Sequence, residues 1–342
     1  MRYCLIAAIA ALFFSACAPT AQSEISRTDF VLGTVCSVRI LEGGSTKTTD
    51  EIFAHLKAIE DRMSANKDGT EIAELNAAAG NRAVKVSTDT FDVIAKGIEY
   101  ATLTQGAFDI SIGPLVKLWN IGTDYAKVPP KAEIAAALKL VDYRKIQLDT
   151  KNLTVRLPVP GMRLDLGAIA KGYSADEVVK ILTKHKVKAA VVDLGGNVLV
   201  FGKKKDGSPW RVGVQDPRSE RGDYIGLVTG QAMTVVTSGI YERFFVEAGK
   251  HYHHIFDTKT GYPADNGLVS VSIIAANSVD ADALSTSLFA LGLQKGMELA
   301  KNLPDIQAIF IDDKKRVYMT PGASKIFSLT NKEYSLSELP QP

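Results

Sequence analysis

The sequence predicts an α+β fold with mixed sheets, packed helices and one large domain. Strand and helix patterns alternate irregularly, without the regular strand–helix–strand units of a doubly wound sheet. Two pairs of strand patterns are joined as hairpins, one through Gly195-Gly196-Asn197 and one around Asp313-Lys314. No break in charge or composition marks a domain boundary, so we expect residues 28–342 to form a single domain.

The predicted elements follow from the spacing of apolar residues. Apolar residues recur at helical spacing between Ile52 and Met63 and between Phe91 and Ala101, and further helices are predicted over 131–140, 168–184 and 278–291. Pro158 and Pro160 confine one extended segment to an edge or bend. The predicted strands cover residues 30–41, 155–166, 187–194, 198–202, 210–215, 227–234, 251–257, 268–275, 306–312 and 316–319.

The N-terminal residues indicate export. One positive charge precedes an apolar run from Cys4 to Phe14, which is shorter than the roughly 20 residues of a transmembrane helix. Small residues then precede Cys17, as in a bacterial lipobox, although Phe14 stands where leucine is usual. We therefore expect a lipoprotein signal over 1–16, lipidation of Cys17, a tether over 17–27 and a membrane-anchored protein facing the periplasm. The alternative is an ordinary signal peptide cleaved near Ala21.

Composition excludes several classes of protein. The 342 residues are 46% hydrophobic with a formal net charge of +2, and no basic run suits nucleic acid. Cys36 is the one thiol beyond the signal and its cleavage site, so no internal disulfide is expected. It lies in an apolar stretch and is predicted to be a core residue. The dinucleotide-binding, Walker A, GxSxG and HExxH motifs are all missing.

A first candidate site lies in the helix predicted over 278–291. Asp282 and Thr286 are four residues apart, so they share a helix face opposite the leucines at 284, 288 and 291. A carboxylate and a hydroxyl placed in this way offer two oxygen ligands to Mg²⁺. The alternative is a solvated helix face with acids near its N-terminus, and spacing alone favours that alternative.

A second candidate site is the segment Asp165-Leu-Gly-Ala-Ile-Ala-Lys171-Gly-Tyr. A strand ends at Asp165 and a helix begins after Gly167, so free backbone N–H groups and Lys171 can face a phosphate. Asp165 is equally suited to cap the helix, and the residues alone leave both interpretations open.

A third candidate site is His251-Tyr-His-His254, which is followed by Asp257. On a strand His251 and His253 share one face and His254 points the other way, which disfavours zinc. One histidine beside Asp257 can serve as a general base near neutral pH.

A fourth segment, Gly106-Ala-Phe-Asp109-Ile-Ser-Ile-Gly-Pro-Leu, is predicted as a loop that leads into an apolar strand. Together with the segments above it resembles the FAD:protein FMN transferases of the ApbE type, and the resemblance covers nearly the whole chain. The matching stretches also include Leu-Gly-Thr at 32–34, Met-Ser at 63–64, EIAELN at 71–76, DLGGN at 193–197, TSGIYER at 237–243 and DADALST at 280–286.

The resemblance implies a T-fold-related, ApbE-like domain that transfers the FMN part of FAD to a threonine or serine hydroxyl of an acceptor redox protein and releases AMP. It implies that His254 and Asp165 act in catalysis and that Mg²⁺ is held by Asp282, Thr286 and the carbonyl of Ala168. The positions that it places against FAD are Leu32, Asn66, Ala107, Phe108, Asp109, Asp165, Lys171 and Ile255.

One position departs from the family pattern. Many relatives carry an aromatic residue, commonly tyrosine, where this chain has Asn66, and loss of a stacked ring removes roughly 1 kcal/mol of contact with FAD. The sequence therefore leaves open a magnesium-dependent FAD pyrophosphatase that yields FMN and AMP. A lipoprotein that only stores flavin is a further alternative, although storage does not require the set Asp282, Thr286, Lys171 and His254.

Overall fold

The computed structural model describes residues 24–339. Cys17 and the predicted export signal lie outside the described residues. Residues 25–27, predicted as the end of the tether, are instead the first residues of strand β1, because they pair with strand β2. None of the described helices is long and apolar enough to cross a membrane.

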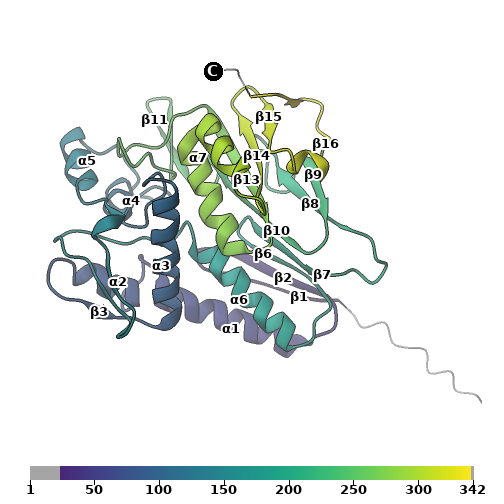
Figure 1. Cartoon of the computed structure of the whole chain (residues 1–342), viewed down its shortest axis with the longest axis horizontal. Helices are drawn as coiled ribbons and strands as arrows, with labels where there is room; N and C mark the ends of the chain where they lie inside the picture. Colours follow the sequence, from purple (N-terminus) through teal and green to yellow (C-terminus); the bar gives the residue numbers. More distant parts are fainter. Residues whose placement is uncertain (1–23, 340–342) are drawn as a thin grey trace, which may run out of the picture.

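A nine-stranded sheet forms the centre of the molecule (Figure 1). Its neighbouring strands are antiparallel except for the last pair, β15 and β17. In spatial order the strands are β1 (Ile25–Val31), β2 (Thr34–Glu42), β6 (Ala189–Leu194), β7 (Asn197–Gly202), β10 (Met233–Gly239), β13 (Leu268–Ala275), β14 (Gln307–Asp312), β15 (Arg316–Met319) and β17 (Ser335–Leu336).

Three helices cover one face of this sheet, which we call the helix face: α1 (Thr46–Met63), α6 (Ala170–Lys184) and α7 (Ser278–Lys301). Side chains alternate along the strands. Cys36, Val38 and Ile40 of β2 are therefore buried with apolar residues of α1 and α6. This confirms Cys36 as a core residue, and it is a free thiol whose pKa is raised by burial to about 12.

The opposite face carries a smaller sheet of β16 (Phe327–Leu329), β9 (Tyr224–Gly230) and β8 (Trp210–Gln215). The two sheets enclose a second apolar core that includes Val214, Val228 and Ile309. In Figure 1 the small sheet lies on the side away from α6 and α7.

The remaining elements gather at one end of the molecule, beside the edge of the helix layer (Figure 1). They are α2 (Glu71–Ala77), β3 (Val84–Lys85), α3 (Thr88–Leu103), α4 (Gly113–Trp119), α5 (Lys131–Leu138), β4 (Gln147–Asp149), β5 (Thr154–Arg156), β11 (Phe244–Glu247), β12 (Lys250–His253) and the short 3₁₀ turn Tyr143–Lys145. A second 3₁₀ turn, Ala323–Lys325, lies instead beside the small sheet.

The structure confirms the α+β class and several predicted strands, among them those at 210–215, 268–275 and 316–319. It corrects others. The segment 30–41 is a hairpin, because Leu32 and Gly33 take positive φ angles of 58° and 68° and reverse the chain. The segment 227–234 spans two strands, β9 and β10, that belong to different sheets. Neither case carried a strong turn signal in the sequence.

Other boundaries also moved. The segment after Asp109 leads into helix α4 rather than a strand, because Pro114 lies in the first helical turn, where no backbone N–H is needed. Only residues 155 and 156 of the extended segment 155–166 lie in a strand, β5, which begins at Thr154, and the strand predicted over 251–257 ends at His253. Helix α7 continues beyond its predicted end, through a non-helical Gly292.

Candidate functional site

The crossing of α6 and α7 brings the predicted metal ligands together. Gly172 makes this approach possible, because a Cβ atom there would lie 2.3 Å from the carbonyl oxygen of Ser278 and 2.7 Å from Cβ of Asp282. The start of α7 is also fixed by α6. Both carboxylate oxygens of Asp176 accept hydrogen bonds from the first helical amides, Ser278 and Val279, each at 2.8 Å. Asp176 therefore replaces the missing side-chain cap of α7.

Asp282 is buried, with 3% of its surface exposed, so the solvated-face alternative is wrong. Its Oδ2 accepts a hydrogen bond of 2.8 Å from the backbone N–H of Gly172, and the backbone of Lys171 contributes a second. Burial raises the pKa of this carboxyl, while the charge of Lys171 and the two amides lower it. A buried acid held in this way needs a cation or a proton to complete its environment.

The carbonyl of Ala168 lies just before α6, which begins at Ala170. Gly172 is in the first turn of that helix, where backbone amides have no partner within the helix, and its N–H donates to Asp282. Among the described residues no backbone N–H donates to the Ala168 oxygen, whereas the neighbouring Leu166 and Ile169 carbonyls do accept such bonds. A carbonyl without a backbone partner, in the same segment whose amides bind a buried carboxylate, suits a hard-cation site.

Thr286 adds a third oxygen. One turn beyond Asp282, its Oγ1 lies 3.1 Å from Oγ of Ser238 at the end of β10. Oγ of Ser238 also pairs with Ser285 at 2.8 Å, so α7 is fastened to the sheet at this point. The described residues contain no cluster of three His, Cys, Asp or Glu side chains. The donor set of one acid, one hydroxyl and one carbonyl fits Mg²⁺, which keeps several waters, better than zinc.

The loop 106–109 reaches the same region. Asp109 is buried and holds its own loop: Oδ1 accepts from both the N–H and the hydroxyl of Ser111 at 2.7 Å, and Oδ2 accepts from the N–H of Tyr143 at 3.0 Å. Burial raises the pKa of Asp109, and these bonds lower it. Phe108 is also a core residue, with 3% of its surface exposed. Ala107, half-buried, is the more open position of the three.

Two further contacts connect this loop to the other segments. The backbone N–H of Asp165 donates to the carbonyl of Ile110 at 2.9 Å, and the hydroxyl of Thr258 donates to the carbonyl of Gly106 at 2.6 Å. Asp165 does not cap the helix, because α6 begins only at Ala170; its Oδ1 accepts from Gly167 at 2.8 Å. Burial raises the pKa of Asp165, and the nearby charge of Arg243 lowers it.

His254 is oriented by the backbone of Arg243. Its Nδ1 lies 3.2 Å from the Arg243 carbonyl oxygen, which can only accept, so Nδ1 carries the proton and Nε2 carries the lone pair. Desolvation, followed by the charges of Arg243, His253 and Lys171, lowers the pKa of His254 to about 3. The side chain is therefore neutral at ordinary pH. The carboxylate of Asp257 is occupied by Lys259 and Thr260, so it does not orient this histidine as predicted.

The β1–β2 turn closes the site. The Arg243 guanidinium donates to the carbonyl of Gly33 at 3.3 Å, and the Gly33 amide donates to Glu60 at 3.3 Å. Glu60 also binds Lys67, which places the loop containing exposed Asn66 close to Leu32. Leu32 itself is half-buried, and Ile255, beside His254, is buried.

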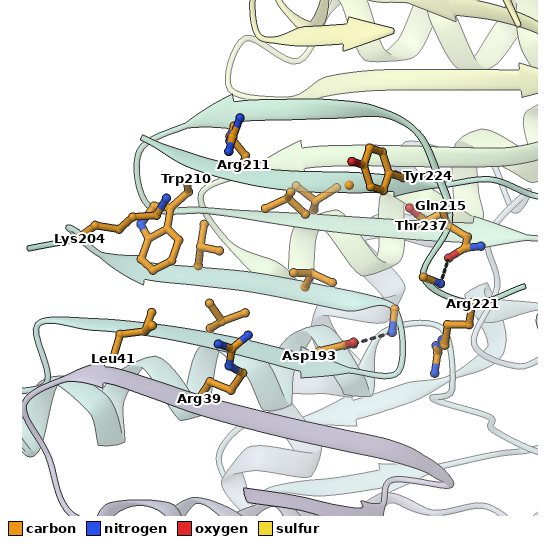
Figure 2. A pocket seen from close by; sticks show the side chains of 18 of the residues that line it. Arg39, Leu41, Asp193, Lys204, Trp210, Arg211, Gln215, Arg221, Tyr224 and Thr237 are labelled. Carbon is orange, nitrogen blue, oxygen red and sulfur yellow. Dashed lines mark hydrogen bonds between the residues drawn. The ribbon is translucent and has the colours of Figure 1, made fainter. Parts of the chain in front are cut away.

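The structure thus links the predicted segments through a chain of direct contacts. The sequence analysis missed four residues that position them: Asp176, Gly172, Ser238 and Arg243. Gly172, Ser238 and Arg243 had no signal beyond membership of matching stretches, because a glycine needed for close helix packing looks like any other glycine, and Asp176 lies outside those stretches. A separate cavity of about 860 Å³ lies on the opposite face of the large sheet and contains none of the predicted site residues (Figure 2).

A buried acid, a free carbonyl, a lysine and an oriented neutral histidine are typical of enzymes that act on phosphate esters with a divalent cation. The chain belongs to the ApbE family, whose model matches residues 32–310. It is 40% identical over 316 residues to the FAD:protein FMN transferase of Treponema pallidum, covering 87% of each chain. A Klebsiella pneumoniae protein of the same name is 39% identical, over 83% of this chain and 88% of that one.

Solved structures agree with this family. The ApbE protein of Thermotoga maritima superposes with a TM-score of 0.82 at 32% identity, over 89% of this chain and 99% of that one. The flavin transferase ApbE of Vibrio cholerae superposes with a TM-score of 0.78 at 27% identity, over the same shares.

Proposed function

We propose that this protein is an enzyme that transfers the FMN part of FAD to a threonine or serine hydroxyl of an acceptor protein, with Mg²⁺ as cofactor and AMP as the second product. The relatives named FAD:protein FMN transferase support the transfer. The observation that carries the metal is the buried carboxylate of Asp282, held by the amides of Lys171 and Gly172, together with the Ala168 carbonyl of the same segment, which accepts no backbone hydrogen bond within the described residues.

Asp282, Thr286 and the Ala168 carbonyl would hold Mg²⁺, and the ion would supply positive charge to offset the negative charge of the pyrophosphate. Lys171 adds a positive charge beside the same oxygens. His254 accepts the proton of the acceptor hydroxyl at Nε2, because Nδ1 is committed to Arg243. The hydroxyl oxygen then bonds to the FMN phosphorus, and AMP leaves with the bridging oxygen.

The test is incubation of the protein with FAD, Mg²⁺ and a candidate acceptor redox protein. The acceptor should gain the mass of FMN less one water and keep its yellow colour after denaturation. An acceptor that stays unlabelled while FAD is split at full rate would replace the transferase with a pyrophosphatase.

The pyrophosphatase has one specific observation in its favour, because Asn66 is exposed and offers no ring to screen the site from water. Replacement of Asn66 by tyrosine should lower FAD hydrolysis more than FMN transfer, by a few-fold, in keeping with roughly 1 kcal/mol of aromatic contact. Equal effects on both rates would remove this role from position 66.

We further propose that Cys17 is the lipidated N-terminus of an exported protein on the periplasmic side of a membrane. The supporting feature is the lipobox-like sequence that precedes it. Replacement of Cys17 by serine should release the protein from membranes with FAD binding intact. A wild-type mass without lipid would contradict this.

A further inference from the structure

The face of the large sheet opposite the helices is only partly covered. The small sheet packs over β10, β13 and β14 and also over Ala189 of β6 and Val200 of β7, whereas β1 adds no residue to this core and β2 adds only the half-buried Leu41. Because paired residues point to the same side, the register defines two rows on this open face. One row runs through Arg39, Val191 and Val200, and the other through Ser37, Asp193 and Val198. Val191 and Val198 are half-buried and pack against the edge of the core beneath the small sheet.

The open face ends in an exposed apolar pair. Phe30 and Val35 are partners across the β1–β2 hairpin and point away from the helices, as Ser37 and Arg39 do. They are 71% and 53% exposed. They also flank the Leu32–Gly33 turn that Arg243 ties to His254. An apolar surface therefore reaches the edge of the proposed active site.

The cavity of about 860 Å³ is a groove that continues this face (Figure 2). Lys204 and Trp210 stand at one end and Arg221 at the other, with Arg39 and Leu41 along one side. At the Arg221 end the lining includes Tyr241 and Glu242, the residues that lead into Arg243. The hydroxyl of Tyr241 is buried and makes no hydrogen bond within the described residues. The groove therefore runs toward His254, the proposed general base. It also contains the Tyr241 hydroxyl, which has no hydrogen-bond partner within the described residues.

Strand β8 borders the groove with a free edge. Strand β9 lies between β8 and the segment 326–330, and it bonds to that segment through Thr229 and Ile225. Alternate residues of an antiparallel strand bond to opposite neighbours, so β9 reaches β8 through Gly226, Val228 and Gly230, which are paired with Val214, Val212 and Trp210. The backbone groups of Arg211 and Gly213 are left on the free side, and β8 has no second neighbour among the described strands.

We propose that the acceptor protein docks on this open face, with an extended segment added as a strand beside β8. This rests on the proposed function, which requires a macromolecular hydroxyl to reach His254. The occupant follows from three features: the apolar pair at the edge of the active site, the groove that leads from it and a strand edge suited to backbone pairing. Basic and acidic residues line the groove in equal numbers, so we expect backbone and apolar contacts rather than charge to hold the segment.

The first test compares two ends of one sheet. Phe30→Glu combined with Val35→Glu places charge on the apolar pair. Leu336→Glu, in β17 at the far edge of the same sheet, is the matched control. Leu336 is 58% exposed, so it is an exposed apolar residue like the pair. With an acceptor that wild type labels, the double variant should raise the acceptor KM about tenfold or more, the equivalent of 1.4 kcal/mol. The FAD affinity of the double variant should equal that of wild type. The acceptor KM of the Leu336→Glu control should also equal that of wild type.

The second test separates backbone from side chain. Arg211→Pro removes an N–H on the free edge without breaking a bond to β9, and proline is tolerated on edge strands. Arg211→Ala removes only the side chain. The proline variant should raise the acceptor KM and the alanine variant should not, with thermal unfolding showing that both remain folded.

Unchanged acceptor KM values in the double variant and in Arg211→Pro would overturn the proposal. It would equally be overturned if the double variant instead dissociated a dimer in light scattering, or lost binding to phosphatidylethanolamine–phosphatidylglycerol vesicles, with labelling unaffected. A wild-type protein that labels no acceptor would show that the proposed function itself has failed, and the docking surface would fall with it.

Discussion

The two faces of the nine-stranded sheet use their polar residues in opposite ways. On the helix face, Asp282 is buried and Asp176 is half-buried. Each carboxylate accepts hydrogen bonds from backbone amides. On the open face, the groove of about 860 Å³ is lined by charges that lie at its rim, such as the Arg221–Glu242 pair at 3.9 Å. This groove therefore does not hold the predicted site residues. Buried acids with unusual partners locate the chemistry better than the volume of a cavity does.

The largest effect is expected from the base. His254→Ala should slow FMN transfer by roughly 10²–10⁴-fold, the usual contribution of a positioned acid–base group. FAD binding, measured by fluorescence titration, should change little. His251→Ala is the control, because His251 stacks on Phe244 outside the contacts of the site. Equal losses in both variants would mean that this hairpin acts through structure alone.

The second largest effect is expected from the loss of a proposed Mg²⁺ ligand on the helix face. Asp282→Ala removes the one charged oxygen of the set, so the Mg²⁺ concentration for half-maximal rate should rise about 10–100-fold. Helix α7 should persist, since alanine suits a helix. Asp280→Ala is a matched control, because Asp280 accepts from Tyr100 and lies away from the Gly172 amide. A variant as active as wild type at low Mg²⁺ would place the metal elsewhere.

A smaller effect is expected on the free energy of unfolding when a glycine on either face of the sheet is replaced by alanine. Gly172→Ala forces a methyl group to within 2.3 Å of the Ser278 oxygen, so it should cost about 1–3 kcal/mol of unfolding free energy. Gly213→Ala in β8 meets Cβ of Tyr224 at 3.1 Å and should cost less. Denaturant titration of both variants measures the difference. An equal cost would mean that the α6–α7 crossing is looser than its contacts indicate.

The smallest expected change is in pH dependence. The pKa of His254 is lowered to about 3 and that of His253 to about 4. Both side chains therefore stay neutral at pH values well below the pKa of an ordinary histidine. Transfer should therefore not fall between about pH 7 and pH 5 through protonation of His254, whose unperturbed pKa is about 6.5. Their contribution to stability is complete above about pH 6.5 and is lost as pH falls toward the folded values. A rate that halves near pH 6.5, at saturating FAD and Mg²⁺, would show that His254 is solvated.

The sequence located the site segments better than the contacts within them. Asp282 and Thr286 lie on one helix, α7, as predicted, and the structure adds the reason why Asp282 is not solvated, which is the approach of Gly172 from a helix 110 residues away. The prediction that one histidine of the 251–254 segment lies beside Asp257 does not hold for His254, because the Asp257 carboxylate accepts hydrogen bonds from Lys259 and Thr260 in its own loop. The actual partner is a carbonyl, which sequence patterns do not reveal.

What the sequence determined by itself is local in origin. Helical spacing, strand patterns and the order of the matching stretches fixed the α+β class, the family and the list of candidate residues, because these depend on neighbours within a few positions. Tertiary structure alone decided that the Gly172 amide serves Asp282, that Arg243 sets the tautomer of His254 and that one face of the sheet stays open. Each of these depends on which backbone group meets which side chain across distant parts of the chain, and only packing settles that.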